Sequence, residues 1–359
     1  FTAEQHDGDW RVAFDNQRAK GVLDYYRAPE KPLAMSFDYL YLPEGSVSAG
    51  LTVLGSSATD TARRDVLENS IPQQLPALDL NVKKLFLGQQ ASGRWAFNMR
   101  PNSHGVSLES LEFKLRGLKG KGDVDWWYKE GVHSSQFRGK VLIADVAEML
   151  DAWQQTAAIE GKGAKFRGQV DWSGSPANFS LLTMQGPVTL TAKKGRVVDV
   201  QSLRLLGVLN FNTLARRLRF DFSDLFKKGF SFDGVDGAFQ FEQGKLQFIE
   251  PLVIHGPSAK FKVEGQTDLL NEQFEHDVTV VLPVSDNIPF IAALAGFPQA
   301  AIPVYIFNQT FGNPFDRFSS VNYKVSGSWD APDVVLNSYF DTSGLPGIDD
   351  NSVKRSQKK

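Results

Sequence analysis

Four short runs between residues 78 and 128 decide the fold class, because apolar and polar side chains alternate within each of them. The runs are Leu78-Asp79-Leu80-Asn81-Val82, Trp95-Ala96-Phe97-Asn98-Met99, Leu111-Glu112-Phe113-Lys114-Leu115 and Val124-Asp125-Trp126-Trp127-Tyr128. A period of two is typical of a half-buried β-strand. Short polar turns such as Gln243-Gly244 join neighbouring runs, which favours antiparallel hairpins. We therefore predict a mainly β protein built on a long twisted antiparallel sheet.

The alternation resumes along the rest of the chain, for example at Phe239 and Phe241 and at Val278 and Val280. Predicted helices are few and short. Asp145 can cap an amphipathic helix over residues 145–160, and residues 59–69 indicate a polar surface helix or turn. No linker rich in Pro, Gly or Ser separates domains. Residues 1–340 are therefore predicted to form one continuous sheet, followed by a disordered polar tail over residues 341–359.

Composition excludes several function classes. Lys and Arg number 39 against 41 for Asp and Glu, which gives a net charge of −2 and no large positive field for nucleic acid. The chain has no cysteine, so disulfides, thiolate metal sites and cysteine nucleophiles are absent. Aromatic residues make up 12% of the chain, and 27 of them are Phe. Phe has no polar group, so this excess indicates extensive apolar surface.

A search for catalytic motifs finds none. The chain lacks the spacings typical of zinc sites, phosphate-binding loops and serine nucleophiles. The lone histidines are each predicted to be polar-face strand or turn residues: His6, His104, His133, His255 and His276. We therefore expect no enzyme activity, no metal and no cofactor.

Residues 287–315 carry no charged side chain, and Pro289, Pro298 and Pro303 interrupt them. Two short apolar helical pieces are expected in place of one membrane-spanning helix. Two interpretations stand equally: the pieces plug the open end of the sheet, or they contact a membrane surface. The residues concerned are Phe290, Ile291, Leu294, Phe297, Ile302, Tyr305, Ile306 and Phe307.

Residues 216–232 interleave cations, carboxylates and phenylalanines. Arg216, Arg217 and Arg219 can hold an acidic head group over an apolar floor. The more ordinary interpretation is a structural turn in which Asp221 and Asp224 pair with these arginines.

The same region resembles a known family. Gly207-Val208-Leu209-Asn210, Asp221-Phe222-Ser223-Asp224-Leu225-Phe226 and Lys228-Gly229-Phe230 are similar to the C-terminal signature of the large AsmA-like proteins of Gram-negative bacteria, of the YhdP type. The closing Tyr323-Lys324-Val325-Ser326-Gly327-Ser328-Trp329-Asp330-Ala331-Pro332 agrees as well. The resemblance covers roughly residues 20–340.

This resemblance implies a periplasmic bridge, anchored in the inner membrane and reaching the inner leaflet of the outer membrane. Phospholipids would move along a hydrophobic groove formed by the sheet, and other envelope proteins are further expected partners. The chain begins at Phe1 without a start or signal segment, so we expect a C-terminal fragment of such a protein.

The alternation supplies candidate groove-lining residues. Each alone is typical of an ordinary core, but together they indicate an apolar track. They are Leu80, Val82, Trp95, Phe97, Leu111, Phe113, Trp126, Val170, Phe239, Phe241, Phe248, Phe261 and Val280. The alternative function is a structural scaffold or assembly factor of the cell envelope that carries no lipid.

Overall fold

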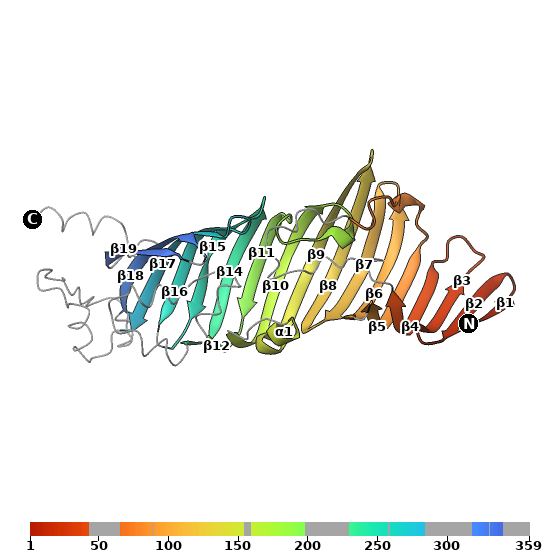
Figure 1. Cartoon of the computed structure of the whole chain (residues 1–359), viewed down its shortest axis with the longest axis horizontal. Helices are drawn as coiled ribbons and strands as arrows, with labels where there is room; N and C mark the ends of the chain where they lie inside the picture. The colour runs from red at the N-terminus through yellow and green to blue at the C-terminus, as the bar shows by residue number, and fades with distance from the viewer. Residues whose placement is uncertain are drawn as a thin grey trace, which may run out of the picture.

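The computed structural model describes residues 1–42, 65–88, 90–153, 159–197, 230–257, 259–283, 318–329 and 331–339. These residues form a mainly β structure, as the alternation predicts (Figure 1). The strands are β1 (Thr2–His6), β2 (Asp9–Asp15), β3 (Ala19–Tyr25), β4 (Leu33–Leu42), β5 (Leu78–Leu87), β6 (Gln90–Asn102), β7 (Gly105–Leu115), β8 (Leu118–Lys129), β9 (Val132–Asp145), β10 (Ile159–Ser173), β11 (Gly186–Ala192), β12 (Gly195–Val197), β13 (Phe230–Phe232), β14 (Gly234–Glu242), β15 (Lys245–His255), β16 (Lys260–Asp268), β17 (Gln273–Pro283), β18 (Phe318–Ser328) and β19 (Asp333–Tyr339). The described helices are α1 (Val146–Ala152) and the 3-10 turns η1 (Pro72–Gln74) and η2 (Pro176–Asn178).

All 19 strands belong to one long sheet, whose long axis runs across the strands (Figure 1). Strands β1 to β11 pair in chain order, β11 pairs with β14, and β14 to β19 again pair in order. Strands β12 and β13 form a short side ladder against the start of β10. Among the described residues no ladder joins β1 to β19, so the sheet is open.

One strand pair departs from the predicted antiparallel arrangement. Strands β4 and β5 are parallel, with Leu33 opposite Leu78 and Phe37 opposite Val82, so the sheet is mixed. A parallel pair needs a long connection that returns the chain to the edge where it started, and the chain between Leu42 and Leu78 supplies that length. Alternation is the same in parallel and antiparallel strands, so it does not reveal this direction.

The predicted helix over residues 145–160 is present but shorter. Asp145 caps α1 as expected, because its side chain accepts a hydrogen bond from the Glu148 N–H. Helix α1 ends at Ala152, and β10 begins at Ile159 because residues 159–161 pair with β12. Met149 and Leu150 pack against the ends of β9 and β10, so the helix covers the ends of these two interior strands.

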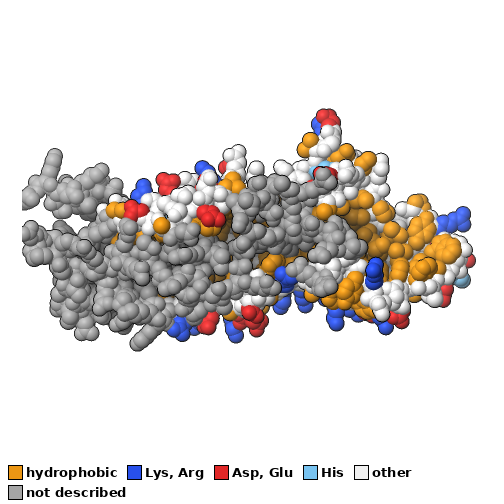
Figure 2. Space-filling model, in the orientation of Figure 1, with side chains coloured by type: hydrophobic (Ala, Val, Ile, Leu, Met, Phe, Trp, Pro, Cys, Tyr) orange, Lys and Arg blue, Asp and Glu red, His pale blue; other side chains and the backbone are white. Residues whose placement is uncertain are grey.

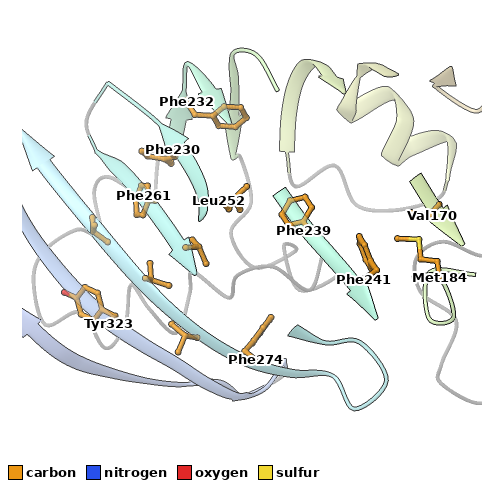
Figure 3. Packing of buried hydrophobic residues seen from close by; sticks show 14 of the residues in the cluster. Val170, Met184, Phe230, Phe232, Phe239, Phe241, Leu252, Phe261, Phe274 and Tyr323 are labelled. Carbon is orange, nitrogen blue, oxygen red and sulfur yellow. The ribbon is translucent and has the colours of Figure 1, made fainter. Parts of the chain in front are cut away.

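The largest hydrophobic cluster extends from β7 to β19. Figure 3 shows part of it, from Val170 to Tyr323. Phe230 and Phe261 meet edge to face in it, with ring centroids 4.9 Å apart. A smaller cluster of Ala19, Phe37 and Val82 holds the N-terminal strands together. The apolar side chains therefore form a layer along the sheet.

Candidate functional site

The two faces of the sheet differ in chemistry. Residues directly opposite one another in a ladder point to the same face, so the register assigns each side chain to a face. One register row from β5 to β11 is apolar or glycine throughout: Val82, Trp95, Phe113, Gly120, Val141, Phe166 and Leu190. The adjacent row on the opposite face is almost entirely polar: Asn81, Ala96, Glu112, Lys121, Lys140, Arg167 and Thr189. We call these the apolar face and the polar face.

The register places every predicted lining residue on the apolar face. Five of these side chains are half-buried: Leu80, Trp95, Phe97, Phe113 and Phe248. The others are buried: Val82, Leu111, Trp126, Val170, Phe239, Phe241, Phe261 and Val280. The structure thus brings these residues together on one surface; their contact with lipid stays a prediction.

The apolar face is most open at the N-terminal strands. Figure 2 shows hydrophobic side chains gathered at the surface over this end of the sheet. Trp10 on β2 is 41% exposed and its cross-strand partner Tyr25 on β3 is 48% exposed. Exposed apolar surface of this kind typically marks a binding surface.

Glycines and aromatic rings together form the middle of the apolar face. Gly122, Gly139 and Gly168 lie directly opposite one another on β8, β9 and β10. A Cβ atom at Gly139 would lie 2.6 Å from the ring of Phe137 and 2.8 Å from the Cα atom of Gly122. No side chain fits at this position, so backbone and the Phe137 ring form the surface here.

Two histidines contradict the prediction that the lone histidines lie on the polar face or in turns. His133 is 8% exposed and His276 is 1% exposed, and both lie on the apolar face. Thr267 Oγ1 lies 2.9 Å from His276 Nε2, and the Nδ1–H of His276 donates to the Glu264 carbonyl at 3.3 Å. Burial lowers the pKa of His276 to about 4, so the ring is neutral at pH 7.

A segment that the alternation did not identify runs along the ends of the strands from β10 back towards β5. Its carboxylate Asp65 accepts hydrogen bonds of 2.6 Å from both the N–H and the hydroxyl of Ser175. The Glu68 carbonyl accepts from His133 Nε2 at 2.9 Å, and Trp126 Nε1–H donates to His133 Nδ1. We call residues 65–77 the edge strap. Residues 65–69, expected in a polar helix or turn, form a turn within it.

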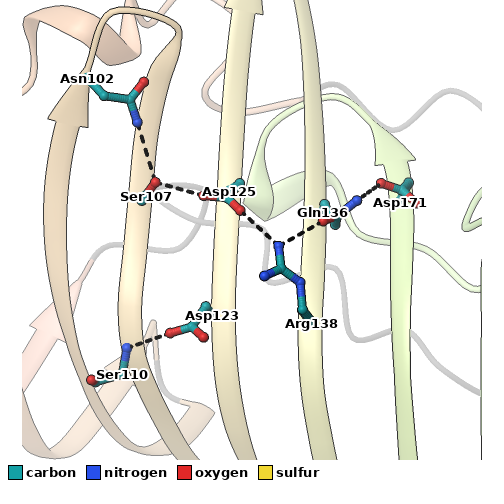
Figure 4. Close-up of polar contacts among 8 residues, drawn as sticks. All are labelled: Asn102, Ser107, Ser110, Asp123, Asp125, Gln136, Arg138 and Asp171. Carbon is teal, nitrogen blue, oxygen red and sulfur yellow. Dashed lines mark hydrogen bonds and ion pairs between the residues drawn. The ribbon is translucent and has the colours of Figure 1, made fainter.

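The polar face is held by hydrogen bonds that cross the strands. Ser107 donates to Asp125 at 2.7 Å, Arg138 bridges Asp125 and Gln136, and Gln136 donates to Asp171 at 2.6 Å (Figure 4). This network ties β7 to β10 on the side opposite the apolar face. Water can solvate these groups, so the polar face needs no cover.

Two groups of predicted site residues lie outside the described residues. They are the membrane-contact or plug residues Phe290, Ile291, Leu294, Phe297, Ile302, Tyr305, Ile306 and Phe307, and the head-group residues Arg216, Arg217 and Arg219. Within the described ranges, no three side chains of the types that bind metals gather closely enough to hold an ion. The helices described there are all too short or too polar to cross a bilayer.

The fold thus defines a class of β-proteins: an open sheet with one polar face and one predominantly apolar face that is exposed in part. The chain belongs to the YhdP protein family, whose model matches residues 1–334. It is 23% identical over 215 residues to a protein of Escherichia coli (strain K12) described as the intermembrane phospholipid transporter YhdP. That match covers 59% of this chain but only 17% of the relative. No solved structure matches the chain.

Proposed function

We propose that the chain is part of a non-enzymatic transporter that carries phospholipids along its apolar face. The observation that carries this proposal is the predominantly apolar face, which runs from β2 to β18 and is exposed at Trp10 and Tyr25. A two-tailed lipid has roughly 30 methylene groups, and transferring each into water costs about 0.8 kcal/mol of free energy. Carrying the bare lipid through water would therefore cost roughly 24 kcal/mol. An apolar face that shields the tails removes most of that barrier, while the head group stays in water.

The similarity to an intermembrane phospholipid transporter supports phospholipid as the cargo. Because the chain spans 17% of that relative, its wider setting is part of the proposal. We propose that the whole protein lies in the periplasm, is anchored in the inner membrane and reaches the inner leaflet of the outer membrane. Contact of residues 287–315 with that leaflet, and of Arg216, Arg217 and Arg219 with head groups, belongs to the same proposal, as do envelope protein partners.

Among the lining residues, the half-buried side chains are proposed as the first to meet acyl chains. Trp95 and Phe113 stack with ring centroids 5.1 Å apart on neighbouring strands, so they offer a continuous aromatic surface. Phe97 lies two residues further along β6 on the same face, opposite Leu80. A buried residue such as Phe241, at 8% exposure, is suited to packing and would not tolerate a charge.

The adjacent residues Phe97 and Asn98 provide a matched test, because they lie on opposite faces of β6. A photo-crosslinking amino acid is placed at either position, and the protein is mixed with radiolabelled phospholipid before irradiation. We expect lipid adducts at position 97 and none at position 98. The variant Phe97→Asp should bind at least tenfold less labelled lipid than Asn98→Asp, and circular dichroism checks that both variants are folded.

Equal adducts at the two positions, or none at either, would contradict transport along the apolar face. The absence of any lipid in native mass spectra of protein purified without detergent would favour an envelope scaffold without cargo.

A further inference from the structure

Several charges on the polar face are paired with opposite charges on the neighbouring strand. Arg11 bonds Asp24 at 2.7 Å, and Arg100 bonds Asp79 at 2.6 Å. Lys83 bonds Asp38 at 2.8 Å. Such cross-strand pairs stabilise a sheet, and the sequence uses them in several places.

Two register rows on the polar face of β6 to β10 differ, because cations lie opposite cations there. Arg94 lies directly opposite Lys114, and Lys114 lies directly opposite Lys119. In the next row Lys121 is opposite Lys140, which is opposite Arg167. Like charges in direct opposition destabilise a sheet. We call this group the basic strip: Arg94, Lys114, Lys119, Lys121, Lys140, Lys165 and Arg167.

The basic strip is short of counter-charge. In the part of the chain that the structure describes, Glu112 is the acid that forms an ion pair with it, through Lys121. The hydrogen bond and charge of Lys121, with the charges of Arg94 and Lys114, lower the pKa of the Glu112 carboxyl. All members but Lys165 are exposed. The strip thus keeps a positive potential at the surface.

Apolar side chains accompany these cations on the same face. Leu142 is 38% exposed and lies directly between Lys119 and Lys165 in the register. On β4 and β5, Tyr41 and Phe86 stack with ring centroids 4.1 Å apart, at the end of the strands nearest Arg94. Cations interspersed with exposed aromatic and aliphatic side chains are typical of surfaces that lie in a membrane interface.

We propose that the basic strip docks the sheet onto a membrane surface that carries anionic phospholipid head groups. Lysines predominate in the strip, and they act as flexible point charges suited to a diffuse layer of phosphates. Five adjacent strands at about 4.8 Å spacing make a surface roughly 19 Å across, wide enough to meet several head groups at once. Leu142 and the Tyr41–Phe86 pair then enter the interface between head groups. This docking is separate from lipid transport on the apolar face.

Vesicle co-sedimentation tests the proposal with the 359-residue chain. The vesicles are phosphatidylcholine with phosphatidylglycerol at 3:1, or phosphatidylcholine alone, in 0.1 M salt. We expect binding to the anionic vesicles only, weakened strongly at 0.5 M salt because exposed charges are screened. The triple variant Lys114→Gln, Lys119→Gln and Lys140→Gln should bind about a hundredfold more weakly, at roughly 1 kcal/mol per cation.

A control variant removes the same charge at exposed lysines on distant strands: Lys245→Gln, Lys260→Gln and Lys324→Gln. It should bind like the unchanged protein. The proposal would be overturned if both variants bound equally or if the protein bound the two kinds of vesicle equally. It would also be overturned if the protein bound polyglutamate but not vesicles. The last result would indicate an acidic protein partner. Crosslinking of lipid at Phe97 from detergent micelles does not depend on the strip, so docking and transport can fail separately.

Discussion

Acidification should destabilise the fold through His276, well before the carboxyl groups titrate. The ring lies between Phe248 and Phe274, with ring centroids 5.4 and 5.6 Å away. Burial is the main cause that lowers its pKa from 6.5 to about 4, while Glu275 and the Glu264 carbonyl act in the opposite direction. The folded state therefore holds the ring neutral, whereas the unfolded chain takes up a proton near pH 6.5.

The size of the effect follows from these two pKa values. A histidine whose pKa is lowered by folding contributes its full stability above pH 6.5, and that stability is lost as the pH falls towards 4. Between pH 7 and pH 5 the free energy of unfolding should fall by about 2 kcal/mol. The carboxyls of Asp38 and Glu112, whose pKa values are lowered by lysines, lose their contribution only at lower pH.

Urea unfolding followed by tryptophan fluorescence at pH 7, 6 and 5 measures this change. His276→Gln should flatten the dependence, because glutamine does not titrate. His255→Gln is the matched control, since the His255 side chain is 48% exposed on the polar face, and it should keep the unchanged dependence. If the unchanged protein and His276→Gln lose the same stability between pH 7 and pH 5, the buried neutral ring is not the cause and the reasoning fails.

Three further changes test the local structure by urea unfolding. Gly139→Ala should cost about 1–3 kcal/mol because the added methyl has no room, whereas Gly234→Ala, whose Cβ would meet its nearest neighbour at 3.7 Å, should be nearly neutral; similar losses would contradict the close packing. Asp65→Ala removes two charge-assisted bonds to Ser175 and should cost about 2–3 kcal/mol, with faster amide exchange confined to the edge strap; uniform exchange would refute a local role. Lys119→Gln should stabilise the fold by about 0.2–1 kcal/mol because it relieves repulsion between like charges; a loss would show that the basic strip is internally compensated.

The alternation of apolar and polar residues predicted most of the fold and the location of the apolar face. Leu80, Val82 and Phe97 follow a period of two, and the register confirms that they share a face. The signal is strong because one slip of register would move every apolar side chain into water. The helix cap at Asp145 could also be predicted, because an N-cap depends only on one side chain and the turn that follows it.

The features that the sequence did not reveal depend on contacts between distant residues. The parallel pairing of β4 with β5 depends on the path of the connection between them, which leaves no mark on the alternation. The edge strap depends on Asp65 meeting Ser175, which lies 110 residues away. The prediction for His133 and His276 was wrong because a polar residue was assumed to face water. Trp126 and the edge strap satisfy the ring of His133, and Thr267 on the neighbouring strand bonds His276.

The same alternating pattern forms both the buried core and the exposed part of the apolar face, and the two differ in how much of the apolar surface is covered. Val278 and Phe261 are 0% and 1% exposed, so protein already occupies the space above them. Trp10 and Tyr25, on the same face, keep 41% and 48% of their surface open. Acyl chains gain most where apolar surface is still exposed to water, because burial already completed contributes nothing to binding. Cargo should therefore engage the N-terminal strands first, and contact with β16 and β17 would require the chain to give up packing that stabilises its own fold.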